Sequence, residues 1–164
     1  MATPDRDTGG QSARFLWLYA LAVAGGAVAY VPFLTILLPL KMGQIARGGE
    51  IEALSYAAFS GAIAASAANI AFGWASDISR SRKPWIIGGV LLSSSLLVTM
   101  RFAETVPEII ALIVAWQFAL NMMLAPLAAW AGDCVPDHQK GTLGGLLAFA
   151  PALGALSGAL VTLP

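Results

Sequence analysis

Charged side chains are scarce in this chain, and their scarcity excludes a soluble fold. Only 11% of the residues are charged and 58% are hydrophobic, whereas soluble domains carry about 25% charged and about 45–50% apolar residues. Five stretches contain no charged residue: 15–40, 53–76, 84–100, 109–132 and 141–164. Each is close to the length of about 20 residues that an α-helix needs to cross a bilayer. The sequence therefore predicts an all-α polytopic membrane protein.

The boundaries of the spans follow from these stretches and their polar neighbours. We expect five transmembrane helices at about residues 15–40, 53–76, 84–103, 107–132 and 141–164, with the lipid bilayer as their solvent. The first 14 residues are polar and rich in Gly, Ser, Thr and Asp, so we expect a disordered cytoplasmic tail over residues 1–14. They lack the basic leader of a cleavable signal, so we expect the first span to remain in the mature protein. The last apolar stretch runs to Pro164, which favours a fragment of a longer protein.

Residues that carry catalytic or metal chemistry are also few. The chain has one cysteine, Cys134, and one histidine, His138. Cys134 has no second thiol to pair with, and His138 has no nucleophile at a recognisable spacing. We therefore expect no enzyme, no metal site and no cofactor. A formal net charge of zero gives no field that would attract nucleic acid.

Lysine and arginine positions predict the orientation, because they accumulate on the cytoplasmic side of membrane proteins. The tail, the second loop and the fourth loop together hold six such residues: Arg6, Arg14, Arg80, Arg82, Lys83 and Lys140. The other two loops hold three: Lys41, Arg47 and Arg101. We expect an integral protein of the plasma (inner) membrane with its N-terminus in the cytoplasm.

Small residues recur every fourth position in the second and fifth spans. In the second span they end in polar residues, and the series is Ala57, Gly61, Ala65, Asn69, Gly73 and Asp77. The fifth span repeats the spacing with Ala150, Gly154 and Gly158, next to Pro151, which is expected to bend the helix. Small residues on one face let two helices approach closely in lipid. The partner is either another of these five helices or a helix outside them.

Polar side chains inside the spans are candidates for a substrate cavity. Gln117 and Asn121 are one helical turn apart, so their amides share a face and could bind a polar ligand. Hydrogen bonding between helices explains each of them equally well, and the same holds for Asn69. Tyr30 is either a cavity residue or an interface anchor. No carboxylate, lysine, arginine or histidine lies in the middle of a span.

The second loop resembles the signature loop of the major facilitator superfamily. That pattern is Gly, three residues, Asp, a basic residue, one residue, Gly, one residue and two basic residues; Gly73, Asp77, Arg82 and Lys83 fall on it. Ile78 replaces the first basic residue and Arg80 replaces the second glycine. The resemblance implies a cytoplasmic latch between two halves of a carrier. Topogenic charges in an ordinary loop are the alternative.

The fourth loop is similar to the segment that follows helix four in sugar-transporting branches of that superfamily. There an acidic residue, two residues, Pro, three residues and Arg-Gly precede a glycine-rich helix. The corresponding residues are Asp133, Pro136, Lys140 and Gly141. Lysine in place of arginine loses the planar fork that binds two acceptors at once.

Together these resemblances imply the N-terminal bundle, helices one to five, of a twelve-helix carrier. They imply a secondary active transporter that works by alternating access, with a C-terminal helical half and a small-molecule substrate as partners. An uncharged polar solute such as a sugar or glycoside is the first expectation for the cargo, and a hydrophobic metabolite or drug is the second. The alternative function is a non-transporting membrane scaffold or assembly factor on the same fold.

Overall fold

The computed structural model describes residues 10–162, and every regular element among them is a helix. Five helical segments are long and apolar enough to cross a bilayer: 13–45, 50–78, 83–100, 106–134 and 137–162. The predicted all-α fold with five spans is therefore confirmed. The prediction of disorder concerns residues 1–14, of which 1–9 lie outside the described residues, and the first helix begins at Ala13.

Capping explains two of the helix boundaries. The Ser12 hydroxyl accepts from the Phe15 N–H at 3.3 Å and begins helix α1 (Ala13–Pro32). At the start of α5 (Val106–Cys134), the Glu108 carboxylate accepts from the N–H groups of Glu104 and Thr105 at 2.8 and 3.2 Å. The Glu108 N–H in turn donates to the Thr105 hydroxyl at 3.4 Å, which completes a capping box.

The first span is interrupted by a turn of π-helix that the sequence analysis did not predict. Helix α1 ends at Pro32 and is followed by η1 (Phe33–Leu37) and α2 (Leu38–Ile45). Pro32 has no N–H to donate to the Val28 carbonyl one turn earlier. The Ser157 hydroxyl lies 3.3 Å from that carbonyl and 2.7 Å from the Gly154 carbonyl of its own helix. A side chain of the fifth span thus hydrogen-bonds a carbonyl that proline leaves open.

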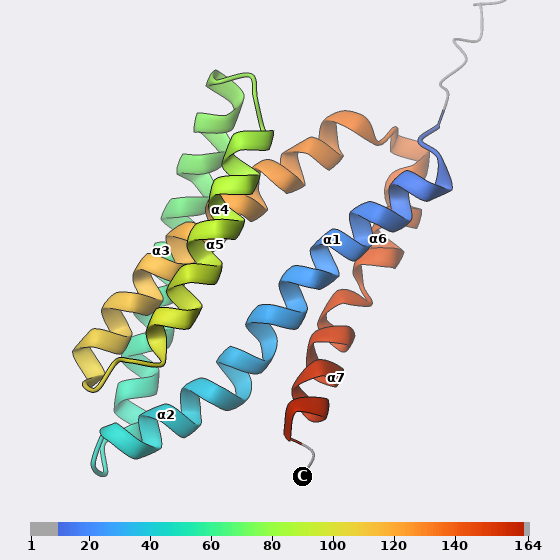
Figure 1. Ribbon diagram of the computed structural model, residues 1–164. Helices are drawn as coiled ribbons and strands as arrows, with labels where there is room; N and C mark the ends of the chain where they lie inside the picture. The colour runs from blue at the N-terminus through green and yellow to red at the C-terminus, as the bar shows by residue number, and fades with distance from the viewer. Residues whose placement is uncertain (1–9, 163–164) are drawn as a thin grey trace, which may run out of the picture. The chain divides into compact units, whose positions relative to one another are not determined.

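The described residues divide into two compact units: residues 10–38 with 132–162, and residues 39–131. In the first unit, α1 lies alongside α7 (Ala150–Thr162) (Figure 1). A Cβ added at Gly154 would lie 2.8 Å from the Ala27 carbonyl, and one added at Gly158 would lie 3.1 Å from Ile36. The small residues of the fifth span therefore pack on the first span. Its helix breaks between α6 (Asp137–Leu147) and α7, with Pro151 in the first turn of α7.

The second unit contains α3 (Glu50–Ile78), α4 (Lys83–Met100) and most of α5 (Figure 1). Gly61 faces α5, because a Cβ there would lie 3.1 Å from Ile113 and 3.7 Å from Gln117. Gly89 of α4 is even closer to α5: an added Cβ would lie 2.5 Å from the Met123 nitrogen and 2.9 Å from the Ala119 carbonyl. Glycine at these positions allows backbones to approach in lipid, where packing drives helix association.

The prediction that the small residues of the second span share one face is wrong. Four residues turn an α-helix by about 400°, so each step of a strict four-residue series rotates by about 40°. Ala57 and Gly61 are buried, but farther along α3 the buried positions are Ala64 and Ala68. Asp77, at the end of the series, is exposed. The series therefore winds around α3.

Replacing Gly89 by alanine should push α4 away from α5, since the new methyl group would meet backbone atoms that cannot move aside. We expect Gly89→Ala to lower the free energy of unfolding by about 1–3 kcal/mol. The measurement is denaturation by sodium dodecyl sulfate of the detergent-purified protein, followed by circular dichroism.

Gly43→Ala is the matched control, because nothing lies within 4 Å of a Cβ at this helical position. Alanine there should be neutral or slightly stabilising, as it is in other helix interiors. Equal stability of the two variants would contradict the close approach of α4 and α5 at Gly89.

Candidate functional site

An ion pair joins the end of α3 to the start of α4. The Asp77 carboxylate lies 2.9 Å from the Arg82 guanidinium, with the Asp77 side chain 61% exposed and that of Arg82 18% exposed. Asp77 is at the C-terminal end of its helix and Arg82 is the N-cap of the next. The helix dipole disfavours an anion at the first position and a cation at the second. The ion pair compensates both.

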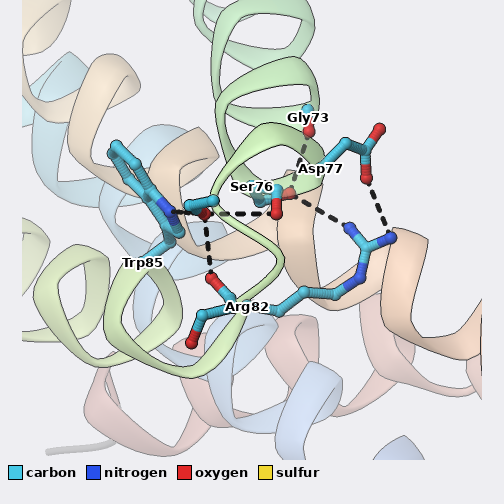
Figure 2. A network of polar contacts seen from close by, with 7 residues as sticks. Gly73, Ser76, Asp77, Arg82 and Trp85 are labelled. Atoms are coloured by element: carbon cyan, nitrogen blue, oxygen red, sulfur yellow. Dashed lines mark hydrogen bonds and ion pairs between the residues drawn. The ribbon is translucent and has the colours of Figure 1, made fainter.

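Ser76 positions the guanidinium between two acceptors. Its hydroxyl accepts from Arg82 Nη1 at 3.0 Å and donates to the Gly73 carbonyl at 2.8 Å. Figure 2 shows the Arg82 side chain reaching back to Ser76 and Asp77 at the end of α3. Ser76 is 1% exposed, so this contact is shielded from water while the Asp77 carboxylate stays accessible. The buried hydroxyl therefore holds Arg82 where it can pair with Asp77.

Trp85 ties the first turn of α4 to the same loop. Its indole N–H donates to the Ser79 hydroxyl at 2.9 Å (Figure 2), and the Ser79 hydroxyl lies 3.2 Å from the Ser76 carbonyl. The Trp85 ring also packs on Phe72, with a centroid distance of 5.6 Å. The tryptophan is thus both an aromatic contact between α3 and α4 and a donor to their connection.

Arg80 makes the tight turn for which the family pattern uses glycine. Its φ angle is 49°, in the left-handed region that glycine enters freely and other residues rarely adopt. The turn is therefore retained without glycine, at a conformational cost of about 1–2 kcal/mol. Arg80 and Lys83 are both exposed.

The predicted fourth loop is shorter than the sequence analysis expected. Asp133 lies in α5, Pro136 is the N-cap of α6, and Lys140 and Gly141 lie within α6. Lys140 pairs with Asp137 of its own helix at 2.6 Å, and both side chains are exposed. Pro136 has an extended ψ of 154°, which suits an N-cap and starts the helix early. The stretch without charge predicts that this span begins at residue 141, but the helix begins four residues earlier because it includes the charged Asp137 and Lys140.

Two of the four cavity candidates, Asn69 and Asn121, meet between α3 and α5, and Gln117 lies one turn before Asn121 on α5. The Asn69 amide donates to the Asn121 side-chain oxygen at 3.3 Å, and the Asn121 amide donates to the Gln117 carbonyl at 2.9 Å. Asn121 is 8% exposed. We call Asn69, Gln117 and Asn121 the amide cluster. Tyr30, the fourth candidate, belongs to the other unit and packs against Ala24, Ala27 and Ala150.

The Gln117 side chain is the most available member of the amide cluster. Within residues 10–162 its carboxamide makes no hydrogen bond to protein, and it lies beside the space left by Gly61. A carboxamide offers two donors and one acceptor, which matches hydroxyl groups of a polar ligand. Across the same residues, no group of His, Cys, Asp and Glu side chains could hold a metal ion.

The residues that support the ion pair have no distinctive sequence pattern. The hydrogen bonds around the ion pair are made by Ser76, Ser79 and Trp85, and Figure 2 shows two of these residues, Ser76 and Trp85, beside Arg82. Serines and a tryptophan near the end of a span are common in membrane helices. The position of Ser76, directly before Asp77, was the only available signal. Gln11 and Gln139 form a second network, described below, that no local pattern indicates.

Comparison with known protein families identifies the family of this chain. The family model described as Major Facilitator Superfamily matches residues 9–159. The chain belongs to the major facilitator superfamily. No curated protein and no solved structure shows significant similarity to it. As a member of this superfamily with five membrane-spanning helices, it is an integral membrane protein of the transporter class.

Glycine in place of Arg80 should relax the left-handed turn of this superfamily member. We expect Arg80→Gly to raise the free energy of unfolding by about 1 kcal/mol, since glycine enters this region of φ at no steric cost. The measurement is again detergent-based unfolding.

Arg80→Ala separates the backbone effect from the charge, because alanine removes the guanidinium but keeps a Cβ at a φ of 49°. It should leave stability near that of the unaltered protein. A gain as large in Arg80→Ala as in Arg80→Gly would show that charge, and not conformation, controls this turn.

Proposed function

We propose that this protein is a secondary active transporter that carries a small uncharged polar solute, such as a sugar or glycoside, by alternating access. Alternating access requires two helical halves that rock about a substrate near the bilayer midplane. These five spans supply one half, and further helices supply the other. The observation that supports the proposal is the ion-pair network at the α3–α4 turn, in the loop whose sequence resembles the family's latch.

Breaking the Asp77–Arg82 ion pair of the proposed latch costs little free energy. Its carboxylate is mostly exposed, and exposed ion pairs are worth about 0.2–1 kcal/mol. Asp77 can therefore exchange Arg82 for a group on the other half of the carrier. The hydrogen bond from Arg82 to the Ser76 hydroxyl, 3.0 Å long in this structure, does not involve Asp77. We expect it to persist during such an exchange, so that the loop keeps its shape and the pair can form again.

The amide cluster supports an uncharged polar cargo. The carboxamides of Asn69, Gln117 and Asn121 offer hydrogen-bond donors and acceptors that carry no charge. A charged cargo would have no oppositely charged side chain of these spans beside it, because the middle of each span contains no charged residue. A hydroxyl-rich solute would match these groups. A purely hydrophobic cargo would leave the Gln117 carboxamide without a partner, which costs free energy in a low-dielectric site.

The proposed orientation places the latch in the cytoplasm. In this proposal successive spans alternate in direction across the bilayer, so the α3–α4 turn and the α5–α6 turn are assigned to the same side of the membrane as the N-terminus. That side carries six of the nine Lys and Arg residues, which favours the cytoplasmic face of the plasma (inner) membrane.

Transport assays in proteoliposomes test the cargo. The protein encoded by the complete coding sequence should take up radiolabelled sugars or glycosides and should ignore hydrophobic cations. Gln117→Leu should weaken sugar uptake about tenfold, the equivalent of about 1.4 kcal/mol lost with one hydrogen-bonded partner. Gln44→Leu, which changes an exposed glutamine of α2, is the control. Uptake of hydrophobic cations alone, or partner binding without any flux, would contradict the proposal.

Removing the latch charge should slow cycling without affecting insertion. Asp77→Asn in the complete protein should reduce the transport rate about fivefold, as expected for a pair worth about 1 kcal/mol. Asp137→Asn is the control, because Asp137 pairs only within the exposed surface of α6. Membrane-inserted amounts are compared by immunoblot. An unchanged rate in Asp77→Asn would show that the charges serve orientation alone.

A further inference from the structure

The segment that precedes α1 is fastened to the turn between α5 and α6. Gln139 binds the backbone of Gln11 twice: the Gln11 N–H donates to Gln139 Oε1 at 2.7 Å, and Gln139 Nε2 donates to the Gln11 carbonyl at 3.1 Å. The Gln11 side chain binds in the other direction, since its Nε2 donates to the Cys134 carbonyl at 2.8 Å. These three hydrogen bonds join residues more than a hundred positions apart.

The chemistry of this contact is that of a carboxamide. A carboxamide has a donor and an acceptor side by side, so it can pair with the N–H and C=O of one residue as a neighbouring strand would. The Cys134 carbonyl belongs to the last turn of α5, where carbonyls have no intrahelical partner. Gln11 supplies that partner.

Gly10 allows the two segments to approach. A Cβ added at Gly10 would lie 2.5 Å from Gln139 Nε2 and 2.9 Å from its Cδ. Any larger residue would therefore move the carboxamide away from the Gln11 backbone. Gln11, Cys134 and Gln139 are all partly buried, so water competes only weakly for these hydrogen bonds.

We infer that Gly10, Gln11, Gln139 and the Cys134 carbonyl form a clamp, named here the N-terminal clamp. It stays closed while the carrier changes conformation, so that the start of the first span and the turn between the fourth and fifth spans move as one piece. Gln11 and Gln139 are positioning residues in this account. The role in movement rests on the proposed transport function, whereas the existence of the clamp does not.

The Cys134 thiol is a nearby probe of the clamp, because Gln11 binds the carbonyl of the same residue and Cys134 is the single cysteine of the chain. Gln139→Glu keeps the size and the acceptor of the side chain but removes the donor to the Gln11 carbonyl. Labelling of Cys134 by the membrane-permeant reagent N-ethylmaleimide should become several-fold faster in Gln139→Glu and in Gln11→Glu, measured by mass spectrometry on native membranes. Gln44→Glu is the control. Labelling rates equal to those of the unaltered protein in both clamp variants would overturn the clamp.

Cross-linking tests whether the clamp remains closed during transport. In a Cys134→Ser background, Gln11→Cys and Gln139→Cys are joined by a short bismaleimide in the complete protein. The cross-linked carrier should transport at the rate of the same protein before cross-linking. Loss of transport on cross-linking would show that the two segments separate in the cycle and would overturn the inference. If neither form transports any solute, the proposed function has failed, and the labelling rates alone decide the clamp.

Discussion

The inability of hydrocarbon to form hydrogen bonds is the constraint on which this structure depends. Every backbone N–H and C=O inside the bilayer must find a partner within the protein, and helices meet that demand. The same demand explains the exceptions. Where Pro32 removes an N–H, the chain forms a π-helical turn and Ser157 of the fifth span approaches the Val28 carbonyl. At the start of α5, the Glu108 carboxylate accepts from the N–H groups of Glu104 and Thr105, and the Thr105 hydroxyl accepts from the Glu108 N–H.

Charge follows the same constraint, because ionised groups are confined to the ends of the spans. Asp77 and Arg82 occupy helix ends that the dipole disfavours, and each is stabilised by the other. Such a pair is satisfied in one conformation and can exchange partners in another. In the proposed transport cycle this is a useful property, since a latch between two halves would have to hold and release with similar ease. Ser76 and Trp85 keep the loop in place around the exposed carboxylate.

The sequence predicted the features that depend on composition and local pattern. Long stretches without charge identified all five spans, and Gly73, Asp77, Arg82 and Lys83 identified the superfamily that the family model also matches. Other features depend on three-dimensional detail. The four-residue series on α3 predicts a single face only if each step is a whole turn. Each step in fact rotates the side chain by about 40° around the helix axis, so the series leaves that face. The pairing of Gln11 with Gln139 joins distant segments through a backbone contact, which no spacing reveals. The left-handed Arg80 contradicts the usual preference for glycine, so a residue-type rule could not predict it.

Sided labelling of single cysteines tests the central claim, that lipid is the solvent of these helices and that the spans alternate across it. Arg82→Cys and Arg47→Cys are introduced separately into the Cys134→Ser protein, and sealed inside-out vesicles are treated with an impermeant maleimide. The account predicts that the cysteine at position 82 reacts in intact vesicles, whereas the one at position 47 reacts only after the membrane is permeabilised. Reaction of both cysteines from the same side of an intact vesicle would contradict it.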